Sequence, residues 1–357
     1  MSSSDLVARR LHRQRLAGAR FEAPEDAVSW LCAVQSQDYG PAKWSVAQRT
    51  AGVTDAELDR AFDDGRILRT HVLRPTWHFV HPADIRWMLE VTGPRVQALN
   101  AHMYRQLQLD EKELARCSDL IAAALRGGNF LTRKEIKTLL EKSGVATDGF
   151  RAAYILMNAE LNGVICSGPL EGRQHTYALL EERAPGARSL GPDDALAELI
   201  VRYYTSHGPA TVKDLRSWAS LTIASIKSGL EMVAPRLEHE VIDGVTYWFS
   251  AAGPAPEIPS PTVHLLQVYD EYVMGYSESR HALDLSDVGR SQPEASVFNL
   301  SVLLDGRFAG RWKRTIKKDS VIIETSLYRA FDASETMALR KAADAYGDFL
   351  GVRAVLA

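Results

Sequence analysis

The sequence predicts an α+β protein in which one arrangement, three helices followed by a β-hairpin, recurs along the chain. Residues 118–185 and 193–252 both show this order, with matching helix caps and hairpin turns. Beyond a proline-rich segment, 254–261, strand patterns dominate. Three helices followed by a hairpin are the winged-helix version of helix-turn-helix. We therefore predict three tandem winged-helix units and a small β-rich domain, arranged as a C-shaped molecule with a concave channel.

The first unit, residues 1–90, follows the template more loosely, and residues 91–117 are expected to form a helical connector. A generic α+β protein with accidental internal similarity is the alternative. The expected elements of this unit are helices 6–16, 24–35 and 55–63 and strands 67–71 and 76–80.

The second unit, 118–185, carries clear local signals. Thr132 and Glu135 are spaced as a capping box, and Asp148 is expected to cap the third helix. The expected elements are helices 118–126, 132–140 and 148–161 and strands 163–167 and 174–180.

The third unit, 193–252, repeats this plan. Thr211 and Asp214 again have the spacing of a cap, and Asp243-Gly244 has the composition of a tight hairpin turn. The expected elements are helix 195–207, a second helix after Thr211, helix 223–233 and strands 237–242 and 245–250.

The last domain, 260–357, is expected to be a partial barrel with a closing helix. Asp305-Gly306 predicts a tight hairpin within it. The expected elements are strands 263–268, 297–304, 307–314 and 321–327 and helix 334–350.

Composition is that of an ordinary globular protein. The 357 residues are 46% hydrophobic and 24% charged, without an apolar run long enough for a transmembrane helix. Cys32, Cys117 and Cys166 are odd in number and far apart, which argues against disulfides and favours the cytoplasm. The net charge of −3 requires any nucleic-acid binder to concentrate its cations on one surface. No cofactor or membrane partner is expected, and without heptad repeats we expect a monomer.

Two glutamines stand out near the N-terminus. Val28, Leu31, Cys32 and Gln35 share one face if residues 24–35 are helical, so Gln35 points its amide toward the packed side. Gln37 follows, just before 38–41, which is expected to end the helix. A buried amide without partners costs roughly 1–3 kcal/mol, so the pair suggests the lining of a polar cleft. The alternative is that both amides cap local backbone.

The cations lie away from the helices that usually read DNA. A major-groove reader needs Arg, Lys, Asn or Gln on its third helix, and these helices offer only Arg151 and Lys227 as cations. A sequence-specific repressor is therefore disfavoured. The C-terminal hairpin is the predicted DNA-binding segment, or alternatively a solvated edge that blocks strand pairing. Its candidate DNA-binding residues are Arg311, Lys313, Arg314 and Lys317.

Three phrases, 33–41, 69–80 and 269–276, give the chain a resemblance to the AlkZ-like DNA glycosylases of the winged-helix superfamily. The resemblance implies that Gln35 and Gln37, as a Gln-x-Gln motif, are catalytic. It also implies removal of N7-alkylated purines and unhooking of crosslinks made by genotoxic natural products, with resistance to such a toxin. The middle residue is usually aliphatic in that family, whereas here it is Ser36.

The implied chemistry suits uncharged catalysts. An N7-alkylated guanine is cationic and leaves readily, so water attack at C1′ needs orientation more than acid catalysis. We expect Gln35 and Gln37 to position that water on double-stranded DNA. Only Lys43 is near the pair in sequence, which predicts a monofunctional enzyme without a Schiff base. The alternative function is a noncatalytic winged-helix DNA-binding protein, regulatory or lesion-sequestering.

Several other residues are candidates for the channel. Arg74 is a candidate DNA-binding residue, Asp38 is a rival general base, and Glu271 is a carboxylate that can assist electrostatically. A metal at His71 and His78 is not expected, because no third ligand lies nearby. The candidates for lining the channel are Tyr39, Trp77, His78 and Asp270.

Overall fold

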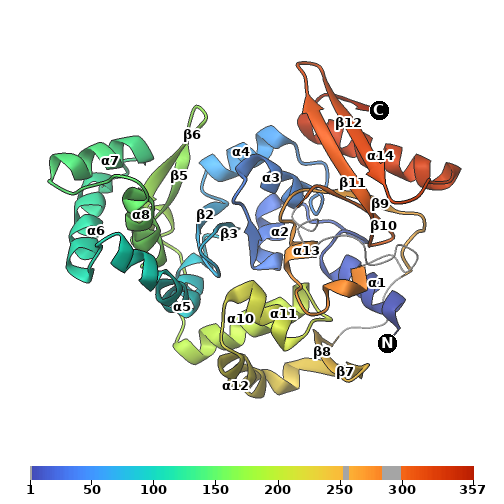
Figure 1. Cartoon of the computed structure of the whole chain (residues 1–357), viewed down its shortest axis with the longest axis horizontal. Helices are drawn as coiled ribbons and strands as arrows, with labels where there is room; N and C mark the ends of the chain where they lie inside the picture. The colour runs from blue at the N-terminus through green and yellow to red at the C-terminus, as the bar shows by residue number, and fades with distance from the viewer. Residues whose placement is uncertain (1, 252–256, 284–298) are drawn as a thin grey trace.

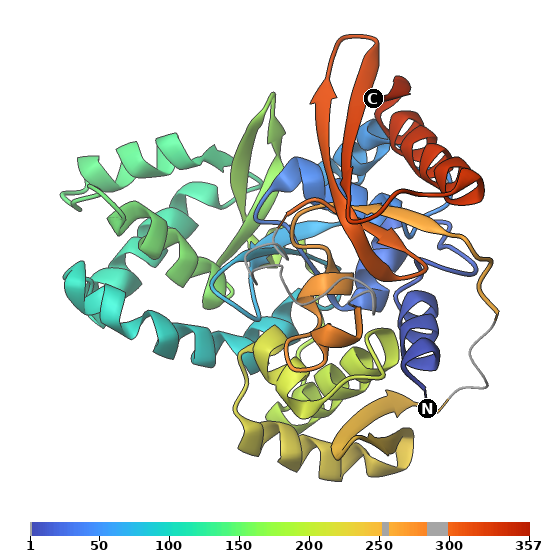
Figure 2. The same cartoon turned by 45° about the vertical axis from the view of Figure 1, so that its right-hand side comes forward.

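The computed structural model describes residues 2–251, 257–283 and 299–357. The N-terminal part lies at the centre, with the segments that follow it grouped around it (Figure 1). Figure 2 shows the same arrangement after a 45° turn: residues from about 107 to 183 on one side, 192–250 below, and the C-terminal sheet above. Among the described helices, none is both long and apolar enough to cross a membrane.

The N-terminal part is built on a small antiparallel sheet of order β1-β3-β2, in which Gln35 is paired with His78. The elements are α1 (Ser3–Arg13), α2 (Pro24–Leu31), β1 (Ala33–Gln35), α3 (Tyr39–Ala47), α4 (Asp55–Asp63), β2 (Leu68–His71) and β3 (Trp77–Val80).

The expected helix 24–35 is wrong at its C-terminal end. Helix α2 stops at Leu31, Cys32 adopts a positive φ of 71°, and Gln35 ends strand β1. Residues 38–41 begin helix α3 rather than end a helix, since Pro41 lies in its first turn, where a missing N–H costs nothing. Pairing with β3, distant in sequence, overrides the helical periodicity that we read over 28–35.

The second group of elements spans residues 85–183. The capping box predicted in it is confirmed, because the side chains of Thr132 and Glu135 each accept from the other residue's backbone N–H. The predicted cap at Asp148 is wrong: the third helix starts at Arg151 after Phe150, without a side-chain cap. The elements are α5 (Ile85–Gln106), α6 (Glu111–Leu125), β4 (Leu131–Thr132), α7 (Arg133–Lys142), α8 (Arg151–Leu161), β5 (Ile165–Glu171), β6 (Gln174–Leu179) and α9 (Leu180–Arg183). Strands β4, β6 and β5 form one sheet.

The third group of elements spans residues 192–250 and matches the expected elements closely, including the Thr211 capping box and the hairpin at Asp243-Gly244. Its elements are α10 (Pro192–Ser206), α11 (Val212–Ala219), α12 (Ile223–Val233), η1 (Ala234–Arg236), β7 (Leu237–Ile242) and β8 (Val245–Ser250). The division of residues 1–252 into three winged-helix units stays a prediction.

The C-terminal part is an open sheet of order β13-β12-β11-β10-β9, packed against α14. Strand β13, parallel to β12, was not expected. The predicted strand residues 297 and 298 lie outside the described residues. The elements are β9 (Val263–Leu266), α13 (Glu271–Met274), η2 (Arg280–Leu283), β10 (Ser301–Leu304), β11 (Arg307–Ile316), β12 (Ser320–Leu327), α14 (Ala333–Leu350) and β13 (Arg353–Leu356).

Candidate active site

Gln37 lines a hollow of about 640 Å³ between the N-terminal sheet and the second group. Its side chain is exposed, and its Oε1 accepts a 3.3 Å hydrogen bond from the backbone N–H of Trp77. Tyr39, Trp77 and Asp38 line the same hollow. The other lining residues are Arg69, Arg133, Lys134, Lys137, Gln174, His175 and Tyr177.

The backbone beneath Gln37 is held by Arg69. The Arg69 guanidinium donates to the Ser36 carbonyl at 3.0 and 3.1 Å and lies over the Trp77 ring at 4.4 Å. The Trp77 indole also donates to the buried Glu160 carboxylate at 3.3 Å. Contacts on both ring face and ring nitrogen fix the indole, so this wall of the hollow is preorganised. The Ser36 Oγ is buried and has no hydrogen-bond partner among the described residues.

Gln35 has a different environment from Gln37. Its side chain is 4% exposed, its backbone N–H donates to Glu271 Oε1 at 2.8 Å, and its Oε1 accepts from Arg74 Nη2 at 2.8 Å. A guanidinium only donates, so the amide oxygen must face Arg74. Because neighbouring residues of a strand point to opposite faces, the β1–β3 register puts Gln35 opposite the face that carries Trp77. Gln35 does not line the hollow of Gln37.

Arg74 and His78 form one hydrogen-bonded group with Gln35. Arg74 Nη2 also donates to His78 Nε2 at 3.0 Å, and Nη1 donates to the Trp218 carbonyl at 2.6 Å. His78 Nδ1 therefore carries the proton and donates to the Thr76 carbonyl at 2.9 Å. Burial and the nearby Arg74 charge hold the pKa of His78 well below its usual value, so the imidazole is neutral. His78 is fully buried, and its predicted place in the channel lining is wrong.

Asp270 was predicted to line the channel, and this is also wrong. Its side chain is fully buried, paired with Arg49 at 2.8 and 3.0 Å, and caps α13 through the Tyr272 N–H. Burial raises the pKa of Asp270, but the Arg49 charge together with the hydrogen bonds from Arg49, Ser45 and the Tyr272 N–H outweighs burial, and the pKa lies below the usual value. Asp270 is therefore part of a buried hydrogen-bond network with Arg49 and the start of α13.

Glu271, the first residue of α13, connects the C-terminal part of the chain to strand β1, which ends at Gln35. It is fully buried and accepts from the Gln35 N–H and from Trp218 Nε1, each at 2.8 Å. His71, by contrast, contacts Glu160 at 2.5 Å rather than His78. Within residues 2–251, 257–283 and 299–357, no group of three His, Cys, Asp or Glu side chains is placed to hold a metal.

The cations at the end of β11 differ in their surroundings. Lys313 is exposed and shares one face of the sheet with Arg311, since alternate residues of a strand point the same way. Arg314 points the other way and donates to the Tyr346 hydroxyl at 2.5 Å. Lys317, exposed like Lys313, follows the last residue of β11. In Figures 1 and 2 the β11–β12 hairpin projects from the same end of the molecule as the β5–β6 hairpin.

Residues 131–179 also contribute to the hollow, which the sequence did not predict. Arg133, Lys134 and Lys137, all exposed, come from α7, and His175 comes from β6. Burial and the Arg69 charge lower the pKa of His175 to about 4, so it is neutral near pH 7. The only sequence signal was three closely spaced cations after the Thr132 cap.

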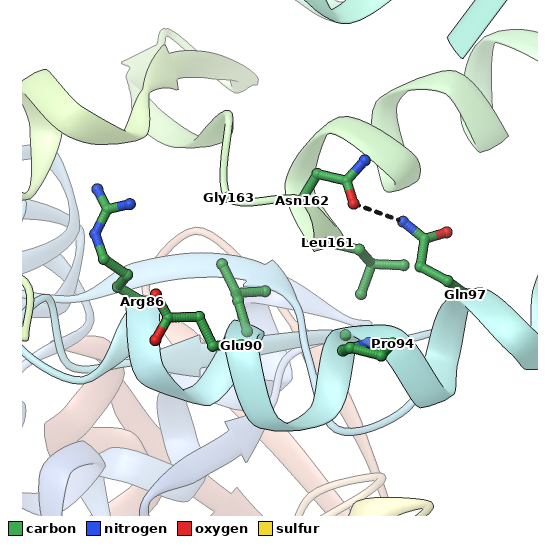
Figure 3. Close-up of a pocket in the computed structure, with 9 residues that line it drawn as sticks. Arg86, Glu90, Pro94, Gln97, Leu161, Asn162 and Gly163 are labelled. Carbon is green, nitrogen blue, oxygen red and sulfur yellow. Dashed lines mark hydrogen bonds between the residues drawn. The ribbon is translucent and has the colours of Figure 1, made fainter. Parts of the chain in front are cut away.

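A smaller hollow of about 230 Å³ lies between α5 and the end of α8 (Figure 3). Gln97 and Asn162 are joined across it by a 3.2 Å hydrogen bond. A Cβ on Gly93 would lie 2.9 Å from the Leu161 carbonyl oxygen, so the two helices approach closely here. Neither Gln35 nor Gln37 lines it, and we regard it as a packing junction.

Comparison with known proteins defines the class. Residues 28–349 match the family described as "DNA glycosylase AlkZ-like", so the chain belongs to this family of DNA glycosylases. A relative from Streptomyces sahachiroi, the interstrand DNA cross-link repair glycosylase, is 26% identical over 323 residues, which are 86% of each chain. The solved structure of the Streptomyces sahachiroi DNA glycosylase AlkZ superposes over the full length of both chains with a TM-score of 0.81 and 21% identity.

Proposed function

We propose that this glycosylase acts as a monomer on double-stranded DNA, excises N7-alkylated purines and unhooks bulky or crosslinked adducts. Protection of the cell from a DNA-alkylating toxin is the corresponding physiological role. The observation that carries the proposal is the exposed amide of Gln37 in a hollow lined by three aromatic side chains, Tyr39, Trp77 and Tyr177, and by several cations. Cations suit the phosphates, and aromatic rings suit an unstacked base.

Gln37 is the residue that we assign to the attacking water. Its carbonyl oxygen already accepts from the Trp77 N–H, and the oxygen's second lone pair can accept from a water molecule. An amide is a poor base, but an oriented water suffices when the leaving base is already cationic. Because the catalyst is uncharged, an unmodified purine without that charge is cleaved negligibly.

Gln35 has an indirect role in this scheme. Its contacts with Arg74 and Glu271 make it the anchor of the strand that leads to Gln37. The sequence suggested that two amides hold the water. We assign the water to Gln37 alone, because of these two amides only that of Gln37 lines the hollow.

The sequence places only Lys43 near the glutamines, but in the structure Lys134 and Lys137 line the hollow of Gln37. A monofunctional enzyme therefore requires that neither of these two lysines forms a Schiff base. Lysines that form Schiff bases are usually desolvated, whereas both of these are exposed. Lys43 is buried and paired with Asp59 at 2.7 Å and with Asp55 at 2.9 Å. Water therefore remains the proposed nucleophile, and borohydride trapping of a covalent DNA adduct would contradict it.

The test uses Gln37→Ala, with Gln174→Ala as the matched control because Gln174 is an exposed amide lining the same hollow. Release of 7-methylguanine is measured in single turnovers, together with affinity for the same duplex. Gln37→Ala is expected to lower release by at least about 100-fold at unchanged affinity, while the control keeps its rate. Undiminished release would exclude the assignment, and binding without release by the unaltered protein would favour the noncatalytic alternative.

A further inference from the structure

A second cationic hollow, of about 610 Å³, lies beside α11 and shares no residue with that of Gln37. Residues of α5, of α11 and the turn after it, and of the segment after α13 surround it. Its lining residues are Arg95, Leu99, Lys213, Arg216, Ser217, Ser220, Leu221, Ser277 and Glu278.

The charge of this hollow is only partly compensated. Lys213 forms an ion pair with Glu278 at 2.5 Å. Arg95 and Arg216 are exposed, and no carboxylate of the described residues lies within ion-pair distance of either. Three cations and one carboxylate leave a net charge of +2 on a concave surface. Exposed guanidinium groups and a serine hydroxyl, Ser217, are the donors that proteins use for DNA phosphates.

Hydrogen bonds connect the helices that carry these cations to one another and to strand β1, which ends at Gln35. The Trp218 carbonyl, on the same helix as Arg216, accepts from Arg74, which also holds Gln35. Arg95 Nε donates to the Ser220 carbonyl at 3.3 Å, which joins α5 to the end of α11. Helix α11, which lines this hollow, is thereby connected through Arg74 to Gln35, whereas the cations of α7 line the hollow of Gln37.

From this arrangement we propose that Arg95 and Arg216 bind the phosphate backbone of the duplex to one side of the lesion. The inference rests on the proposed function and deepens it, since it assigns DNA contacts to α5 and α11. Neither residue touches the reacting base. Their loss weakens binding equally on damaged and undamaged DNA and leaves the saturated rate of base release unchanged.

The test measures the affinity of the full chain for a labelled undamaged duplex across a series of salt concentrations. The double variant Arg95→Gln/Arg216→Gln is expected to flatten the plot of log affinity against log salt by about 2, roughly 0.9 for each lost phosphate contact. The control Arg340→Gln/Lys341→Gln removes the same charge from exposed positions on α14 and is expected to leave the slope unchanged.

A slope equal to that of the unaltered protein would overturn the assignment, as would a fall in the saturated rate at unchanged affinity. Glu278→Gln supplies an independent arm, because it leaves Lys213 without its ion-pair partner and is expected to raise affinity. An unchanged salt slope would refute the phosphate contacts of Arg95 and Arg216 but not the proposed function. The proposed function is tested separately, by the release of 7-methylguanine by Gln37→Ala. An unaltered protein that binds no duplex would overturn both.

Discussion

Replacement of Arg74 by Met separates two roles for this residue. The sequence predicted a DNA contact, whereas the Arg74 guanidinium donates to Gln35 Oε1 at 2.8 Å, His78 Nε2 at 3.0 Å and the Trp218 carbonyl at 2.6 Å. Arg74→Met leaves three acceptors on buried residues, Gln35, His78 and Trp218, without this donor, at about 1–3 kcal/mol each. We therefore expect the free energy of unfolding to fall by about 3–9 kcal/mol, with Arg74→Lys between Met and the unaltered protein.

The activity of Arg74→Met is measured under conditions where the variant stays folded. Without its guanidinium the Gln35 amide is free to rotate, and release of 7-methylguanine is expected to fall by roughly 10- to 100-fold, as for a catalytic strand displaced by up to about 1 Å. The salt dependence of duplex binding should not change. A variant that keeps its stability and its rate but loses about 0.9 from the salt slope would refute this reasoning and identify Arg74 as a phosphate contact.

Two further predictions follow from burial and hydrogen bonding. Asp270→Asn removes the charge paired with Arg49 and is expected to cost about 3–5 kcal/mol in urea unfolding, with 7-methylguanine release per folded molecule retained. Because the folded-state pKa of Asp270 is depressed, the pair's contribution is complete above the ordinary Asp value of 3.8 and is lost as pH falls through the depressed pKa. Stability of Asp270→Asn should therefore depend less on acid pH than that of the unaltered protein. On the β11–β12 hairpin, replacement of two exposed lysines, Lys313→Gln/Lys317→Gln, is expected to reduce the salt slope of duplex binding by about 2. Arg314→Gln is expected to leave the slope unchanged, because Arg314 is hydrogen-bonded to Tyr346, and an equal effect per residue would contradict this assignment.

Local signals predicted most of the elements. Thr132 and Thr211 begin helices where expected, because a capping box is formed by residues three apart, whatever surrounds them. The Asp243-Gly244 and Asp305-Gly306 turns were likewise readable, since both residues of each turn have positive φ in the hairpins that they close. Strand β13 was missed because its four residues follow α14 directly and are held by pairing with β12.

The glutamine pair illustrates where sequence reasoning failed. The spacing of Val28, Leu31, Cys32 and Gln35 fits a helix, and burial of Gln35 was correct although the helix was not. Register with β3 determines that Gln35 lies on the sheet face opposite Trp77, while Gln37 is exposed in the hollow. Periodicity describes the side on which a residue is buried, but not which distant strand it pairs with.

By itself, the amino-acid order determined the α+β class, the capping boxes at Thr132 and Thr211, the two Asp-Gly hairpin turns, and the pair of amides at 35 and 37. Each of these depends on neighbours within a few positions. The tertiary structure alone decided that Glu271 and Arg74 hold Gln35, and that cations of α7 share a hollow with Gln37. These partners are far apart along the chain, and their meeting is set by the packing of whole helices and sheets, which no local spacing encodes.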